Sequence, residues 1–188
     1  KELLEDGILG KIYSCRQQLG GNRIANKEVK LEWRMDEEQS GPGAVSDFGC
    51  HMLDIAHYLF SNTEGSMQDF SLLTNTVITE RNDIKTDEKR KVTNDDVAMF
   101  IARTASGALL SFSASRVGTC NHSIEVVGEG GMVYGDFSKP NQVQVWLKDK
   151  ESGYQEEDKK IVDLKGQTGH VGIIQDFARC IRGESENK

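Results

Sequence analysis

Three ionisable residues, Asp47, His51 and Asp54, follow one another at steps of four and three along the chain. At roughly 100° per residue, these steps place their side chains on one side of an α-helix. A carboxylate beside an imidazole can orient the ring and stabilise its charged form, which suits an acid/base pair in a cleft. Two other interpretations stay open: a divalent metal site shared by His and Asp, and a solvated polar stripe.

The stretch around these residues predicts the helix that must position them. A turn signal, Gly41-Pro42-Gly43, precedes it, and the helix N-terminus favours a bound anion or polarised oxygen. Gly49 is costly inside a helix, which indicates close approach at that point and favours a ligand-facing element. No His or Cys cluster lies nearby in the sequence, so a metal site is less favoured. The apolar positions predicted to share the core-facing side are Val45, Phe48, Met52, Ile55, Ala56 and Leu59.

Composition and charge narrow the class of protein. The 188 residues suit one domain with a sizeable core, and the net charge of −7 argues against nucleic acid or an anionic membrane as main partner. The 188 residues contain no apolar run of membrane-spanning length, and we expect no signal peptide. Four widely separated cysteines, without metal-ligand spacing, indicate free thiols in a reducing cytosol, so we expect a cytoplasmic protein. These are Cys15, Cys50, Cys120 and Cys180.

A long run of strand-like segments follows the central helix. With one strand before the helix, they make seven or eight strands, and a second main helix is predicted over His170 to Arg182. This order favours an α+β domain in which helices pack on one face of a large, open, mostly antiparallel sheet. No helices remain for the second face, so we expect another subunit to cover it. The strands are predicted at residues 10–19, 70–79, 92–103, 108–116, 123–127, 132–137, 142–147 and 159–164, with a charged hairpin or loop at 81–91 and polar turns at 104–107 and 151–158.

Several short motifs occur in a fixed order and together resemble one known family. The most specific part is the Gly-rich turn at Ser40–Ala44, followed by Asp47-x-Gly-x-His51-x-x-Asp54. As an ordered set, the motifs resemble the C-terminal domain of the Gfo/Idh/MocA oxidoreductases, the group of glucose–fructose oxidoreductase and inositol dehydrogenase. The other motifs are Gly10-Lys-Ile12, Trp33-Arg34, Asn94-Asp-Asp-Val97, Ser106-Gly-Ala108, Ala114-Ser-Arg116, Glu125-Val-Val-Gly128 and the Asp176-Phe177 helix ending at Gly183.

The resemblance implies a two-domain enzyme. Residues 1–188 would form its C-terminal substrate-binding and oligomerisation domain, with an N-terminal Rossmann domain and part of the C-terminus missing. NAD or NADP would be bound mainly by that missing domain, and the sequence does not choose between the two. The open sheet face would form a homodimer or homotetramer. The isolated 188-residue chain would then neither bind the dinucleotide tightly nor turn over substrate.

The resemblance also implies roles for individual residues. His51 would be the acid/base at the substrate hydroxyl or carbonyl, and Asp47 would orient the substrate or tune the proton transfer. Pro42 stands where the family more often has glycine; it and Gly43 are possible cofactor contacts, and no metal is expected. The substrate would be a small polyhydroxylated molecule such as a sugar, sugar acid or cyclitol. Its candidate polar contacts are Arg23, Trp33, Arg34 and Arg116.

An alternative from another functional class stays open. The chain could be a non-catalytic ligand-binding or dimerisation module that kept the fold, since some relatives lack the histidine or a catalytic lysine. A metal-dependent hydrolase is a third and more distant alternative.

Overall fold

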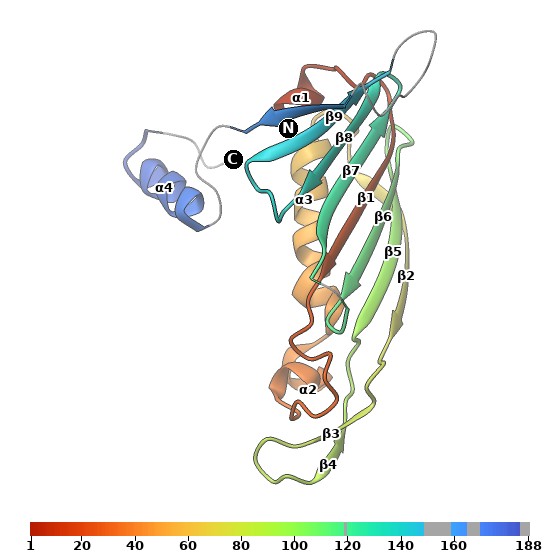
Figure 1. Cartoon of the computed structure of the whole chain (residues 1–188), viewed down its shortest axis with the longest axis vertical. Helices are drawn as coiled ribbons and strands as arrows, with labels where there is room; N and C mark the ends of the chain where they lie inside the picture. The colour runs from red at the N-terminus through yellow and green to blue at the C-terminus, as the bar shows by residue number, and fades with distance from the viewer. Residues whose placement is uncertain (119, 149–158, 165–169, 185–188) are drawn as a thin grey trace.

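One large sheet forms the body of the computed structural model, which describes residues 1–118, 120–148, 159–164 and 170–184 (Figure 1). Its eight strands lie in the order β10-β9-β8-β7-β1-β6-β5-β2, and β3 and β4 form a separate two-stranded hairpin. Neighbours in the large sheet are antiparallel except β1 and β6, which are parallel. The strands are β1 (Ile12–Gly20), β2 (Met67–Asn75), β3 (Glu80–Asn82), β4 (Lys89–Lys91), β5 (Val97–Thr104), β6 (Leu109–Ser115), β7 (His122–Gly128), β8 (Gly131–Asp136), β9 (Gln142–Leu147) and β10 (Lys159–Asp163).

Among the helical segments that the structure describes, the central one lies along one face of the sheet (Figure 1). It begins as a π-helical turn, η2 (Val45–Gly49), and continues as α3 (Cys50–Phe60). The open α+β architecture predicted from the sequence is therefore confirmed. The remaining helical segments are α1 (Glu2–Glu5), the 3₁₀ turn η1 (Trp33–Met35), α2 (Glu37–Ser40) and α4 (His170–Ile181).

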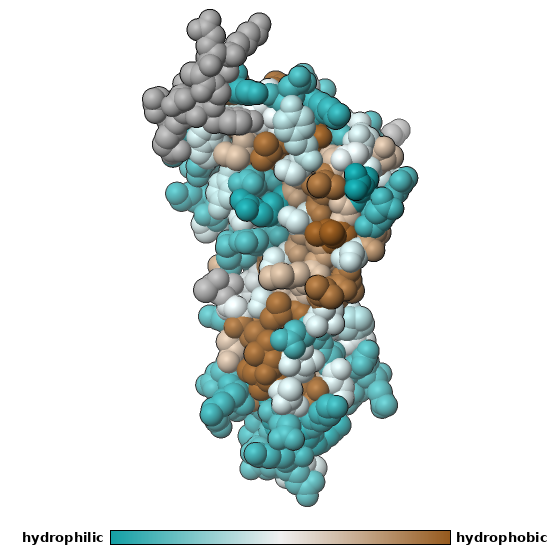
Figure 2. All heavy atoms as spheres, turned by 90° about the vertical axis from the view of Figure 1, so that its right-hand side faces the viewer, coloured by the Kyte–Doolittle hydropathy of each residue, from teal (hydrophilic) through white to brown (hydrophobic). Residues whose placement is uncertain are grey.

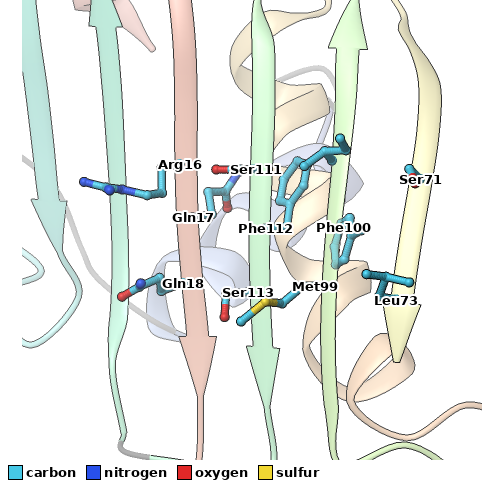
Figure 3. Close-up of a pocket in the computed structure, with 11 residues that line it drawn as sticks. Arg16, Gln17, Gln18, Ser71, Leu73, Met99, Phe100, Ser111, Phe112 and Ser113 are labelled. Atoms are coloured by element: carbon cyan, nitrogen blue, oxygen red, sulfur yellow. The ribbon is translucent and has the colours of Figure 1, made fainter. Parts of the chain in front are cut away.

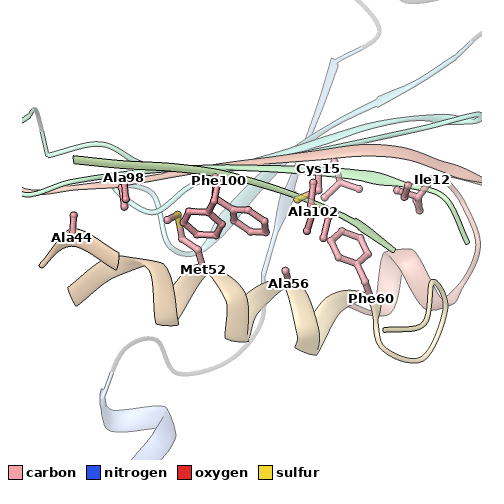
Figure 4. Close-up of a cluster of buried hydrophobic side chains, with 14 of the residues drawn as sticks. Ile12, Cys15, Ala44, Met52, Ala56, Phe60, Ala98, Phe100 and Ala102 are labelled. Carbon is pink, nitrogen blue, oxygen red and sulfur yellow. The ribbon is translucent and has the colours of Figure 1, made fainter. Parts of the chain in front are cut away.

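The core lies between α3 and the inner face of the sheet (Figure 4). Burial alternates strictly along β5 and β6, as expected for strands with one face on the core. Phe100 of β5 and Phe112 of β6 stack with ring centroids 4.5 Å apart. From the helix, Met52, Ala56 and Phe60 are fully buried against these strands.

The buried stripe of the helix differs in part from the predicted one. Met52 and Ala56 are confirmed as buried core residues. Val45, Phe48 and Leu59 are half-buried and pack against this core, whereas Ile55 is half-buried outside it. Gly49 and Phe60 instead complete the buried side. A π-turn holds more residues than an α-turn, so it rotates the stripe relative to a pattern counted at 3.6 residues per turn.

Most predicted strands are present, and two are displaced. The strand expected from residue 92 begins only at Val97, because residues 94–96 use their side chains to bond other segments. The strand expected at 70–79 lies at Met67–Asn75. The charged segment 81–91, predicted to be either a hairpin or a loop, forms the β3–β4 hairpin. The polar turn predicted at 151–158 lies outside the described residues.

The outer face of the sheet is rich in apolar side chains, and Figure 2 looks onto it. Met99 and Ile101 of β5 are more than half exposed there, and Leu73 and Leu109 on the strands beside β5 are exposed as well. The predicted C-terminal helix is confirmed as α4, although its apolar residues are largely exposed. In the part of the chain that the structure describes, no helix has both the length and the apolar character needed to cross a membrane.

Candidate functional site

Asp95 closes the N-terminus of the central helix. Its carboxylate accepts hydrogen bonds from the backbone N–H groups of Gly43 and Val45, at 2.7 and 3.0 Å. Its backbone carbonyl accepts the N–H of Ala44 at 2.9 Å. Three consecutive amides of the first turn are thus bonded to one buried residue. The oxygens predicted to bind at this helix N-terminus are thus those of Asp95. The N–H groups of residues 43–45 are therefore not available to a substrate or cofactor.

Gly43 is required at this junction because the chain approaches it closely. A Cβ built on Gly43 would lie 1.9 Å from the Asp95 carbonyl oxygen and 2.3 Å from Nη1 of Arg116. No side chain fits there. Of the two proposed cofactor contacts, Gly43 is therefore buried against the chain, and Pro42 is exposed.

Gly49 has a different role from the one its position suggested. A Cβ on this residue would lie 3.5 Å from the Phe100 ring, which is an ordinary contact. Gly49 faces the sheet, so its indication of a ligand-facing element is wrong. What the residue provides is helix-to-sheet packing, and alanine would fit in its place.

Arg116 connects three parts of the site from a buried position, with 4% of its side chain exposed. Its Nη2 donates to the backbone carbonyl of Arg34 at 2.8 Å, and its Nη1 donates to Oδ1 of Asn94 at 3.2 Å. Its Nε lies 3.3 Å from Oδ2 of Asp47. The guanidinium predicted to contact substrate is thus held by partners within the chain.

Asn94 reinforces the same junction. Its Nδ2 donates to the carbonyls of Arg34 and Gly41, at 2.9 and 3.2 Å, and to Oγ of Ser40 at 3.0 Å. Asn94 is buried, so these bonds satisfy an amide that would otherwise be costly. Together, Asn94 and Arg116 fix the backbone of η1 beside the start of the helix.

An open depression lies over this junction. Its lining residues are Arg23, Arg34, Asp47 and Phe48, and its volume is about 420 Å³. The Asp47 side chain is 41% exposed, so its carboxylate reaches solvent while Arg116 holds it from the buried side. Three of the proposed site residues, Arg23, Arg34 and Asp47, are thus brought together here, although they come from separate segments of the chain.

The two arginines of the depression differ in their partners. Arg23 forms an ion pair with Glu32. The guanidinium of Arg34 lies over the ring of Trp33, with Cζ 4.3 Å from the ring centroid. Trp33 is about half exposed, so it provides an aromatic surface beside the depression.

A buried arginine holds the loop that carries Arg23. Nη1 of Arg81 donates to the carbonyls of Asn26 and Val29, at 2.8 and 2.9 Å, and Nη2 donates to that of Ile24 at 2.5 Å. Burial lowers the pKa of Arg81, and the charge of Asp96 opposes that shift. Its Nε has no hydrogen-bond partner among the residues that the structure describes. Because β3 supplies this arginine, the hairpin fixes the shape of the loop at residues 24–29.

His51 lies on the exposed side of α3, one turn after Asp47, and is not part of the lining of the depression. Asp54 is also exposed. Among the described residues, the His51 ring has no hydrogen bond or ion pair, and no group of three or more His, Cys, Asp or Glu residues could hold a metal ion. The helix therefore presents Asp47 to the depression and His51 to solvent beside it.

Several residues of the site were not found from the sequence. Phe48 packs partly buried against the core, as predicted, and it also lines the depression, which was not predicted. The Asn94-Asp95-Asp96 run was noted only as part of a resemblance, without a structural role. Three polar residues before a strand are a signal of backbone capping, yet nothing local shows which distant segment they cap.

A second hollow lies on the outer face of the sheet (Figure 3), and its lining shares no residue with that of the depression. Its volume is about 340 Å³, and its lining includes Arg16, Gln18, Met99 and Ser113 from β1, β5 and β6. Arg16 is already bound by both carboxylate oxygens of Glu125, at 3.0 Å each. This hollow belongs to the apolar outer face, not to the depression.

Comparison with known proteins identifies the family. A family model described as the GFO/IDH/MocA C-terminal domain matches residues 1–134. This chain belongs to the GFO/IDH/MocA family. Its resemblance to that family, drawn from the ordered motifs, is confirmed.

Individual relatives within the GFO/IDH/MocA family are sugar dehydrogenases. Levoglucosan dehydrogenase of Pseudarthrobacter phenanthrenivorans is 28% identical over 160 residues, which cover 77% of this chain and 40% of that protein. Glucose-6-phosphate 3-dehydrogenase of Bacillus subtilis is 29% identical over 133 residues, which cover 68% of this chain and 35% of that protein. The chain thus spans less than half the length of either relative.

The fold is shared with a solved GFO/IDH/MocA enzyme. Levoglucosan dehydrogenase in complex with NADH and levoglucosan superposes with a TM-score of 0.80 at 24% identity. The match covers 98% of this chain and 53% of that one. At this identity the likeness establishes the fold alone.

Proposed function

We propose that this chain is the substrate-binding and catalytic half of an NAD(P)-dependent oxidoreductase. The enzyme acts on a hydroxyl or carbonyl group of a sugar, sugar acid or cyclitol. The observation that carries the proposal is the placement of Asp47, whose carboxylate lines a depression while a buried arginine fixes it from within. A carboxylate with one fixed oxygen and solvent access is suited to orient a substrate hydroxyl.

His51 is the proposed acid/base. Oxidation of a hydroxyl needs a group that accepts the O–H proton at near-neutral pH, and imidazole is the side chain best matched to that task. His51 is exposed and has no partner among the described residues, so its ring is open to a bound substrate. Asp47, one turn earlier, sets the position of the substrate beside it.

The cofactor site is proposed to lie mainly in a Rossmann domain outside these 188 residues. NAD or NADP bound there supplies the hydride acceptor or donor. Within this chain, the amides of residues 43–45 are occupied by Asp95, which leaves exposed Pro42 as the candidate contact from the turn. The NADH complex of the structural relative supports a nicotinamide cofactor, and the names of the two sequence relatives support a sugar-type substrate.

The proposal is tested in the longer parent protein by replacing His51 with Ala. Loss of a general acid/base is expected to lower kcat by roughly 10² or more. His57→Ala is the matched control, because His57 is an exposed histidine on the same helix and should keep the parent rate. Equal rates for His51→Ala and the parent protein would remove His51 from the mechanism.

A second measurement tests the division of labour between domains. The purified 188-residue chain is expected to bind neither NAD nor NADP tightly and to be inactive alone. Calorimetric titration with each dinucleotide checks this. Tight binding by the chain alone would refute the two-domain proposal.

A non-catalytic ligand-binding module is the second candidate. It is favoured by one observation, namely that His51 is not part of the lining of the depression. Sugar binding by the parent protein without any change in nicotinamide absorbance would support this candidate over the enzyme.

We also propose that a second copy of the chain covers the outer face of the sheet, in a homodimer or homotetramer in the cytoplasm. Both faces of β5 carry apolar side chains, a pattern typical of strands covered on both sides. Met99→Glu is expected to shift the mass in solution, measured by light scattering, from oligomer to monomer. Thr63→Glu adds the same charge on the turn after α3 and should leave the mass unchanged; a monomeric unsubstituted protein would contradict the proposal.

A further inference from the structure

The guanidinium of Arg34 has no carboxylate partner within the part of the chain that the structure describes. It lies over Trp33 and borders the depression that Asp47 also lines. Stacking on the indole restricts the side chain and leaves the N–H groups at the guanidinium edge free to donate. Arg34 is therefore a cation held in one place beside the proposed substrate position.

The backbone of Arg34 is anchored more firmly than that of an ordinary surface arginine. Its carbonyl accepts hydrogen bonds from Nδ2 of Asn94 at 2.9 Å and from Nη2 of Arg116 at 2.8 Å. Both donors are buried, with exposed fractions of 3% and 4%. Two buried polar side chains thus serve to place one exposed arginine, which is typical of a preorganised binding group.

Among the charged residues that line the depression, Arg34 is the one whose charge no described carboxylate neutralises. Arg23 is paired with Glu32, and the Asp47 carboxylate is paired with Arg116. Arg34 thus remains as surplus positive charge in a chain whose net charge is −7. A guanidinium only donates hydrogen bonds, and its planar fork matches carboxylate or phosphate oxygens better than neutral hydroxyl groups.

We propose that Arg34 binds an anionic group of the substrate, a carboxylate or phosphate, so that the substrate is a sugar acid or sugar phosphate. This inference rests on the proposed function, because it assumes that the depression is the substrate site. Arg34 determines specificity in this arrangement and takes no part in the proton transfer. The open volume of about 420 Å³ is within the range of small-molecule sites.

Equilibrium binding to the full-length protein tests the inference without relying on turnover. The probes are D-gluconate, glucose 6-phosphate and neutral glucose, titrated by calorimetry in the absence of cofactor. We expect one of the two anions to bind more tightly than glucose. Arg34→Gln should weaken binding of that anion about tenfold or more and change glucose binding less than twofold, because a charge-assisted bond is lost only with the anion.

Two variants serve as controls. Arg34→Lys keeps the positive charge but lacks the planar guanidinium. Its affinity for the anion should lie between those of the unsubstituted protein and Arg34→Gln. Arg182→Gln removes an exposed arginine that pairs with Glu184 at the end of α4 and should leave all three affinities unchanged. Weaker binding at higher salt is expected for the anion alone.

Four outcomes overturn the inference: no binding of either anion, anion binding no tighter than glucose binding, an equal loss for glucose and the anion in Arg34→Gln, or unchanged anion binding in that variant. Steady-state kinetics of Arg34→Gln give a further test. If only the KM for the dinucleotide rises, and the KM for the substrate does not, Arg34 binds a phosphate of the cofactor and the inference is overturned. Arg34-dependent anion binding in a protein that transfers no hydride would support the inference and refute the proposed enzyme.

Discussion

Arg116 holds the carboxylate of Asp47 from the buried side of the chain, with Nε 3.3 Å from Oδ2. The same guanidinium donates to the carbonyl of Arg34 at 2.8 Å. One buried cation therefore fixes both the candidate catalytic carboxylate and the segment that carries the proposed anion-binding arginine. In the proposed site, substrate position and substrate specificity would thus be linked through a buried residue.

Replacing Arg116 with Gln is expected to impair both stability and activity. The Asp47 carboxylate is partly exposed, so water screens its ion pair and the pair adds little stability. The larger loss comes from the buried groups left without a donor, about 1–3 kcal/mol in the free energy of unfolding measured with urea. In the parent protein kcat should fall more than KM rises, because a loosened Asp47 misplaces the bound substrate.

Arg116→Lys separates positioning from charge. Lysine supplies a cation for Asp47 without the fork that also reaches Asn94 and Arg34. We expect it to recover part of kcat and little of the stability. Wild-type kcat in both variants would show that Arg116 does not position Asp47.

Asp95→Ala tests the closure of the helix N-terminus. The substitution leaves the N–H groups of Gly43 and Val45 without their acceptors in a buried junction. We expect a loss of about 2 kcal/mol in the free energy of unfolding. Asp54→Ala, at an exposed position of α3, is the control and should change it by less than about 0.5 kcal/mol. Equal stability of the two variants would contradict the capping role.

Asp83 predicts a specific acid dependence of stability. A hydrogen bond from Arg90, at 2.7 Å, and the backbone N–H groups of Lys85 and Thr86 lower the pKa of Asp83 to about 2. Because the folded-state pKa lies below the unfolded value of about 3.9, this contribution is complete above about pH 5 and is lost progressively as the pH falls through about 2. Asp83→Asn should remove that part of the slope in urea titrations between pH 5 and 2, and an unchanged slope would contradict the assignment.

Patterns within single segments were sufficient to predict most of the fold. The segment 92–103 before the turn at 104–107 was predicted as a strand, and the structure has β5 within it, with Ala98, Phe100 and Ala102 buried and Met99 and Ile101 exposed. The spacing of Met52 and Ala56 predicted the core-facing side of α3 correctly. The helix prediction succeeds because periodicity reports which side of an element is buried, whatever it packs against.

Features that depend on distant partners could not be predicted in this way. The parallel pairing of β1 with β6 joins strands separated by about half of the chain, and no local pattern specifies it. The bonds from Asp95 to Gly43 and from Arg116 to Asp47 span 52 and 69 residues. The π-helical turn at Val45–Gly49 shifts the helix register, and a count at 3.6 residues per turn does not show it.

Gly43 and Gly49, at the start of the central helix, are expected to respond differently to substitution by alanine. Gly43→Ala would bring Cβ to 1.9 Å from the Asp95 carbonyl oxygen, so the backbone must move and the helix closure must open. We expect a loss of about 3 kcal/mol or more in the free energy of unfolding. Gly49→Ala would bring Cβ only to 3.5 Å from Phe100, at helical backbone angles of −60° and −40°.

For Gly49→Ala we therefore expect a neutral effect or a gain of up to about 1 kcal/mol, because alanine restricts the unfolded chain and favours the helix. Urea unfolding of the two variants side by side measures both effects. The comparison is matched, since each variant adds one methyl group to the same helical region. A large loss in the free energy of unfolding for Gly49→Ala would indicate that a group other than Phe100 lies close to Gly49. A small loss in the free energy of unfolding for Gly43→Ala would mean that the hydrogen bonds between Asp95 and residues 43–45 adjust at little cost. They would then not hold the start of the helix, and Asp47 with it, in a fixed position.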